Sequence, residues 1–125
     1  SIANNLTINS SIKFIGSSGW TCFNFICNTP GLIITFMVDL NYNVLSTIQA
    51  VGTNVSRIQF VSSSLTNRAN FNLNYGATQS LIYVNATRIN SNGGQTVWSF
   101  AGTLSDTINW NIGSRPPSFG YALMA

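Results

Sequence analysis

The sequence predicts an all-β fold, an antiparallel β-sandwich of about eight to ten strands. Two observations carry this prediction. Aromatic and β-branched residues gather in short runs, and clusters of Gly, Pro, Asn and Ser interrupt these runs roughly every 8 to 12 residues. No segment shows a convincing amphipathic helical pattern. With 125 residues the chain has the length of one domain, which is enough to bury a core without disulfides or metals.

The predicted strands follow one another along the whole chain. In order they cover residues 11–15, 20–27, 32–40, 44–51, 55–61, 69–75, 81–89, 95–101, 107–112 and 119–124. Turn residues separate them, and Asn92-Gly93-Gly94 indicates a hairpin turn. The residues from 43 to 51 carry the weakest strand pattern.

Alternation gives several of these strands two different faces. Phe71, Leu73 and Tyr75 share one face of residues 70–75, and asparagines occupy the other. Ile108, Trp110 and Ile112 alternate with polar residues in the same way. The Asn-rich faces meet either water or another copy of the chain, because neutral amides can pair across a contact without the desolvation cost of charges.

The charged residues exclude several classes of function. Only 6% of the residues are charged, and the five cations, Lys13, Arg57, Arg68, Arg88 and Arg115, are too scattered for a phosphate-binding stripe. The longest apolar run, residues 32–38, is far shorter than the roughly 20 residues that span a bilayer. We therefore expect neither nucleic-acid binding nor membrane insertion.

The two cysteines, Cys22 and Cys27, lie in one predicted strand. Residues five apart in a strand face opposite sides and lie roughly 16 Å apart, whereas a disulfide needs Cα atoms within about 7 Å. We expect two free thiols packed as small apolar side chains, which favours assembly inside a cell.

The sequence offers little for catalysis. It has no His, and its two carboxylates are Asp39 and Asp106. No Ser-His or Cys-His pair can therefore form, and no zinc-ligand spacing occurs. We expect a protein that is not an enzyme and that uses no cofactor and no metal.

The first sixteen residues resemble a shaft repeat of a trimeric viral fibre. Asn5-Leu6-Thr7-Ile8-Asn9, then Ser11-Ile12-Lys13-Phe14 and Gly16, are similar to the triple β-spiral of adenovirus fibres. Residues 118–122, Ser-Phe-Gly-Tyr-Ala, resemble the aromatic last strand of the fibre head. Gly19-Trp20-Thr21 stands in place of the Thr-Leu-Trp-Thr that opens many such heads. The resemblance implies the end of a shaft in residues 1–16 and a head, or knob, in residues 17–125.

A fibre head implies attachment of the virion to a host-cell receptor, either a protein or a glycan that is sialylated or of another kind. Such a head would be a non-catalytic homotrimer at the tip of a fibre on the virion surface, assembled inside the host cell, in the nucleus if adenoviral. The predicted receptor-binding residues are Arg115, between two prolines and a strand, and Arg68, because a guanidinium suits a carboxylate such as that of sialic acid.

A second class of function fits the same residues. A free-standing β-sandwich lectin or adhesin domain would bind a glycan through aromatic and amide side chains and need not be a trimer. Its candidate contacts are Trp20, Trp98, Trp110, Asn92 and Asn111.

Overall fold

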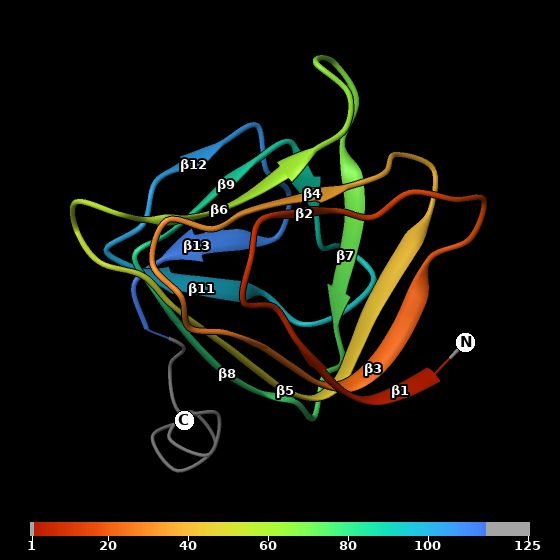
Figure 1. Ribbon diagram of the computed structural model, residues 1–125, viewed down its shortest axis with the longest axis horizontal. Helices are drawn as coiled ribbons and strands as arrows, with labels where there is room; N and C mark the ends of the chain where they lie inside the picture. The colour runs from red at the N-terminus through yellow and green to blue at the C-terminus, as the bar shows by residue number, and fades with distance from the viewer. Residues whose placement is uncertain (1, 115–125) are drawn as a thin grey trace, which may run out of the picture.

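A computed structural model describes residues 2–114 of the chain (Figure 1). These residues form no helix, and so none that could cross a membrane. They form thirteen strands: β1 (Ile2–Thr7), β2 (Ile12–Lys13), β3 (Trp20–Cys27), β4 (Ile33–Phe36), β5 (Asn41–Val51), β6 (Ile58–Ser62), β7 (Ala69–Leu73), β8 (Thr78–Ile82), β9 (Val84–Thr87), β10 (Ile89–Asn90), β11 (Val97–Phe100), β12 (Leu104–Ser105) and β13 (Trp110–Ile112). The all-β prediction is confirmed.

The strands pair in parallel, and the prediction of an antiparallel β-sandwich is wrong. One sheet runs β1-β3-β5-β8-β11-β13, with β7 beside β5 and β10 beside β7; the other runs β12-β9-β6-β4-β2. Every strand pair within residues 2–114 is parallel. Most neighbours in sequence, such as β3 and β4, lie in different sheets, although β7 and β8 share a sheet and so do β10 and β11. Each strand pairs with its counterpart one turn of the chain away (Figure 1).

The chain is thus a parallel β-solenoid. Ile34 of β4 pairs with Ile12 of β2, and Tyr42 of β5 pairs with Trp20 of β3, so both partners lie 22 positions apart. We call each such turn of the chain a coil. Short turns connect the sides of one coil instead of reversing the chain, which is why turn signals and alternating residues fit a sandwich equally well.

Single residues with positive φ make several of the corners. Tyr83 (φ 54°) lies between β8 and β9, and Arg88 (φ 54°) lies between β9 and β10. Their backbone amides still donate to the neighbouring coil, Tyr83 to Phe100 at 2.8 Å and Arg88 to Ser105 at 2.9 Å. The hydrogen-bonded ladder therefore continues around these corners, which satisfies backbone groups that would otherwise be unpaired.

The predicted hairpin at Asn92-Gly93-Gly94 does not form. This turn joins β10 to β11, but β10 pairs with β7, and β11 pairs with β8 and β13. Instead, the turn changes the direction of the chain within one coil, and the strands on either side of it pair with strands of the preceding coil.

Aromatic rings from successive coils fill the interior. Phe36 packs against Phe71 with ring centroids 5.1 Å apart, and Phe71 packs against Phe60 at 5.4 Å. Trp20 stacks on Phe25 at 5.5 Å and meets Tyr42 edge-on at 5.2 Å. Phe71 and Leu73 are fully buried, as their alternation predicts, but Tyr75, assigned to the same face, is 69% exposed because the strand ends at Leu73.

Cys22 and Cys27 are both free and completely buried, which confirms the prediction of unpaired thiols. The expectation that they face opposite sides is wrong. The pairing of β3 with β5 shifts register between Cys22 and Asn24, so this irregularity changes the phase of the alternation and turns both thiols into the core. Burial raises the pKa of Cys22 to about 11 and that of Cys27 to about 12.

The segment that resembles a fibre shaft belongs to the first coil of the solenoid. β1 pairs with β3, and β2 pairs with β4, in the same two sheets that continue through the chain. The division into residues 1–16 and 17–125 stays a prediction. The predicted strand 119–124 and the fibre-like residues 118–122 lie outside the described residues.

We expect Phe71→Ala to lower the free energy of unfolding by about 3–5 kcal/mol, because the truncation leaves a cavity among four packed rings. The matched control is Phe23→Ala, whose ring is 42% exposed and should cost less than about 1 kcal/mol. Urea denaturation of the three proteins measures both values. Equal losses for the two variants would contradict the assignment of Phe71 to the core.

We also expect stability to fall as the pH rises above the ordinary thiol pKa. In that range the unfolded chain releases the protons of Cys22 and Cys27, whereas the folded chain keeps them until about pH 11 to 12. Urea midpoints at pH 7 and pH 10 measure the loss, and it should shrink in the Cys22→Ala/Cys27→Ala double variant. An alkylating reagent at pH 8 should label neither thiol until the protein is denatured; rapid labelling of the folded protein would contradict the burial.

Candidate functional site

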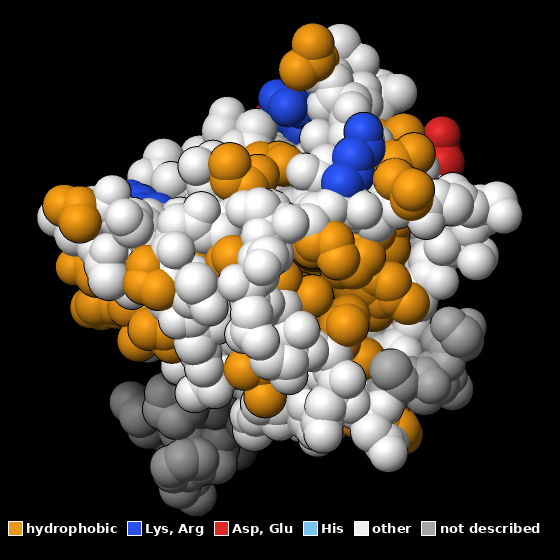
Figure 2. Space-filling model, viewed as in Figure 1, with side chains coloured by type: hydrophobic (Ala, Val, Ile, Leu, Met, Phe, Trp, Pro, Cys, Tyr) orange, Lys and Arg blue, Asp and Glu red, His pale blue; other side chains and the backbone are white. Residues whose placement is uncertain are grey.

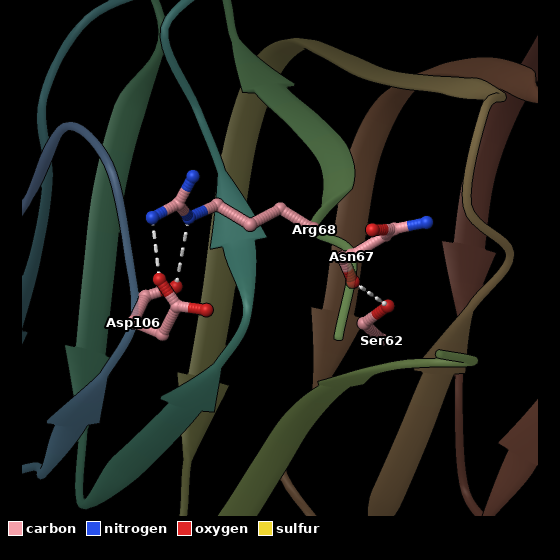
Figure 3. Close-up of polar contacts among 4 residues, drawn as sticks. All are labelled: Ser62, Asn67, Arg68 and Asp106. Atoms are coloured by element: carbon pink, nitrogen blue, oxygen red, sulfur yellow. Dashed lines mark hydrogen bonds and ion pairs between the residues drawn. The ribbon is translucent and has the colours of Figure 1, made fainter. Parts of the chain in front are cut away.

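Arg68, one of the two predicted receptor-binding residues, is engaged within the protein. Its guanidinium forms an ion pair with the carboxylate of Asp106, and its Nε donates to the Asp106 carbonyl at 3.2 Å (Figure 3). Both side chains are about two-fifths exposed, so the pair lies at the surface. Arg115, the other predicted residue, lies outside the described residues.

Two further cations also make contacts within the chain. Arg57 lies over the Tyr83 ring at 5.5 Å and donates to the Asn54 side chain at 3.0 Å and to Thr103 at 3.1 Å. The Nε of Arg88 donates to the Ser64 carbonyl at 2.8 Å. The face of the molecule in Figure 2 accordingly carries only a few separate cationic groups on a largely neutral surface. Charge does not mark out a site on this face.

The three tryptophans lie in different surroundings. Trp110 is buried, and its indole N–H donates to Ser91 Oγ at 2.7 Å. Trp20 lies in the aromatic core, where its buried indole N–H has no hydrogen-bond partner among the described residues. Trp98 of β11 instead occupies an outward position, between the buried Val97 and Ser99. Of the three, Trp98 is the one whose ring lines a surface cavity.

This cavity has a volume of about 320 Å³ and lies on the outer face of the larger sheet. We call it the Trp98 cavity. Phe100, which is 52% exposed, lies two residues along β11, and Asn111 of β13 pairs directly with Trp98. The lining residues are Gln79, Ser80, Leu81, Ile82, Trp98, Phe100, Gly113 and Ser114.

A glutamine side chain explains the local geometry of the cavity. β8 and β11 pair directly at Leu81–Ser99 and Ile82–Phe100. Before these pairs, the Gln79 amide bridges the strands: its Oε1 accepts from the Trp98 backbone N–H at 2.8 Å, and its Nε2 donates to the Thr96 carbonyl at 2.9 Å. A side chain therefore replaces a stretch of the backbone ladder and fixes the backbone that carries Trp98.

Gly113 completes one wall of the Trp98 cavity. A methyl group at this glycine would lie 3.8 Å from the indole ring, and its φ of 123° is one that other residues rarely adopt. The indole therefore packs beside bare backbone.

Neutral side chains form hydrogen-bonded ladders on the outside of the solenoid. Asn72 donates to the Asn43 side chain at 3.3 Å, and Asn43 donates to Thr21 Oγ1 at 3.4 Å. Asn24 donates to Asn5 at 2.7 Å in a separate ladder. A second cavity, of about 210 Å³, lies along the first ladder and is lined by Thr21, Asn43, Val44, Leu45, Asn72, Asn74 and Gly93.

Groups that could act as acids, nucleophiles or metal ligands do not converge. Asp106 is held by Arg68, and Asp39 lies in the turn between β4 and β5. Within residues 2–114, no three His, Cys, Asp or Glu side chains lie close enough together to hold a metal ion. The raised pKa values of the two buried thiols keep them protonated at neutral pH.

Sequence reasoning named Trp98 and Asn111 among the glycan contacts but missed their neighbours. Gln79 and Ser80 come together with Trp98 only because β8 and β11 belong to successive coils, whereas Phe100 lies two residues along β11 itself. No local motif marks these residues, so they could be found from the sequence only if the number of positions between successive coils were known. Of the remaining predicted contacts, Trp20 and Trp110 lie in the core, and Asn92 is exposed in the turn before β11.

The chain matches no known protein family, and no curated protein or solved structure shows significant similarity to it.

Proposed function

We propose that this chain is a non-catalytic attachment module that binds a neutral part of a glycan receptor at the Trp98 cavity. The observation that carries the proposal is an outward-facing indole beside a cavity with hydroxyl and amide groups around it. Cavities that bind small molecules have volumes of about 300–1,000 Å³, and this one has the size of the smallest of them.

Aromatic and neutral polar groups suit the two kinds of surface that a sugar ring presents. The apolar C–H face of a pyranose packs on an aromatic ring, which Trp98 and Phe100 offer. Its hydroxyl groups donate and accept, and the hydroxyls of Ser80 and Ser114, which line the cavity, do both.

The lack of a cation among the lining residues favours a neutral sugar over sialic acid. A buried or half-buried carboxylate requires a paired charge or several hydrogen-bond donors. Arg68 already pairs with Asp106, and the lining residues of the Trp98 cavity are all uncharged. We therefore propose that the receptor is recognised by stacking on Trp98 and not by an arginine that pairs with a carboxylate.

We propose an attachment role because a single contact of this kind is weak and becomes useful when many copies bind one surface. A shallow cavity gains binding strength when many copies engage a surface together. We retain the expected arrangement for this reason: a homotrimer on a fibre at the virion surface, with its receptor on a host cell. A rigid parallel solenoid, with the backbone hydrogen-bonded from coil to coil, is a suitable shape for such a fibre.

Trp98→Ala should abolish binding on an array of immobilised neutral and sialylated glycans while leaving the far-UV circular dichroism spectrum unchanged. The physical reason is the loss of the stacking surface. Tyr75→Ala is the matched control, because this ring is 69% exposed and lines neither cavity. Trp98→Phe should retain part of the binding.

Unchanged glycan binding by Trp98→Ala would contradict the proposed site. If the same variant instead changes the molar mass in solution, the Trp98 surface is a contact between copies of the chain, and the glycan proposal is wrong.

We expect the purified chain to be a homotrimer at micromolar concentration, as proposed for a fibre. Multi-angle light scattering measures its molar mass against the 13.5 kDa of one chain. A monomer at all concentrations would contradict the trimeric fibre and favour a free-standing lectin. Glycan binding by that monomer would still support the Trp98 site.

A further inference from the structure

The turn between β10 and β11 contains the one Asn-Gly dipeptide of the chain, Asn92-Gly93. We infer that Asn92 is a site of spontaneous deamidation and that Asn72, from the preceding coil, slows this reaction in the folded protein. The inference is independent of the proposed glycan site, because these residues do not line the Trp98 cavity.

The reaction needs only the chain and water. The backbone nitrogen of Gly93 loses its proton to water and attacks Cγ of Asn92. A bond forms between these two atoms, and the bond from Cγ to Nδ2 breaks; the departing NH2 takes up a proton from water and leaves as ammonia. Water then opens the resulting five-membered imide at either carbonyl and leaves an aspartate or an isoaspartate at position 92. No electrons are transferred, and the net change is the replacement of NH2 by OH.

Several features of the turn favour the reaction. Asn92 is exposed, and its side-chain amide makes no hydrogen bond to any of the described residues. The following residue is a glycine, which has no Cβ to hinder the approach of its nitrogen to the Asn92 side chain. The Asn92 side-chain amide is therefore accessible to water, and no Cβ of residue 93 blocks the approach of the backbone nitrogen to it.

Asn72 slows the reaction because it binds the backbone nitrogen of Gly93, which is the nucleophile. The Gly93 N–H donates to Asn72 Oδ1 at 3.0 Å, so this hydrogen bond must break before the nitrogen can turn toward Cγ of Asn92. The Asn72 side chain also packs closely over the glycine, since a methyl group at Gly93 would lie 2.7 Å from Oδ1. In addition, the Asn92 backbone N–H donates to Asn90 Oδ1 at 3.0 Å, which holds the other side of the turn.

The ladder of Asn72, Asn43 and Thr21 on the outside of the solenoid holds Asn72 in this position. Its Nδ2 donates to Asn43, which in turn donates to Thr21. The stacking of one coil on the next therefore restrains a chemical reaction in a turn. Deamidation would place a negative charge beside Gly93, at the edge of the second cavity, where the lining is otherwise neutral.

The experiment compares deamidation rates of intact proteins at neutral to mildly alkaline pH by proteolysis and mass spectrometry of the peptide that contains Asn92. Asn72→Ala should accelerate the mass change at Asn92 about fivefold, the factor that corresponds to a typical net hydrogen bond. Asn24→Ala, which removes an outward amide from a separate ladder, should leave the rate unchanged. Wild-type protein unfolded in urea should react at Asn92 faster than the folded protein.

Asn72→Asp keeps an acceptor for the Gly93 N–H and should react at nearly the wild-type rate. Asn72→Leu keeps a side chain of similar size without an acceptor and should react about fivefold faster, which tests the hydrogen bond even if the alanine variant fails to fold. Three results would overturn the inference: equal rates in wild type and a folded Asn72→Ala variant, equal rates in folded and unfolded wild type, or a first mass change at another asparagine in the unfolded chain.

Discussion

The constraint on which this structure depends is the parallel stacking of each coil on the next. Hydrogen-bonded strands lie about 4.8 Å apart, so an outward side chain meets its counterpart from the next coil at close range. Like charges in such a column repel one another. They also cannot hydrogen-bond to their own kind, because a carboxylate only accepts hydrogen bonds and an ammonium group only donates them. An amide does both and pairs with another amide, as Asn72 does with Asn43. The low charge and high Asn content of the sequence therefore follow from the fold.

The same stacking organises the interior. The ring centroids of Phe36 and Phe60, on neighbouring strands of one sheet, lie 5.5 Å apart, and Phe71 of the facing sheet packs against both at 5.1 and 5.4 Å. The polar groups that enter the interior are hydrogen-bonded: the buried Gln95 amide donates to the carbonyls of Asn74 and Ala77, each at 2.7 Å. The indole N–H of Trp20, which has no partner within residues 2–114, departs from this rule.

The sequence was sufficient to predict the position of most strands and part of their inner faces, but not how the strands pair. Residues 20–27 form the expected strand, and Phe71 and Leu73 point inward as expected. Alternation has the same period in parallel and antiparallel sheets, so it cannot distinguish them. The clearest signal for coils was the 22-position offset of Ile12 and Ile34, but the loops after β4 and β6 differ in length and hide the repeat.

The site was less predictable than the fold. Trp98 was among several candidates, but local sequence could not separate an outward indole from the buried one of Trp110. Trp110 is buried as its alternation predicts, but Ile112, assigned to the same face, is 58% exposed, and Asn109 just before Trp110 has a φ of 64°. A non-glycine residue in this conformation is uncommon and leaves no clear mark in the sequence.

The segment between β6 and β7 shows how this architecture tolerates changes in length. It projects from the body of the protein (Figure 1), and Leu65 is 88% exposed. At its base, Ser62 Oγ donates to the Asn67 carbonyl at 2.7 Å and closes the loop (Figure 3). Because this bond holds both ends together, residues between them can be exchanged or added without moving β6 or β7 out of register. The loop is thus a natural position for sequence diversification, and a suitable place to insert a foreign epitope for display.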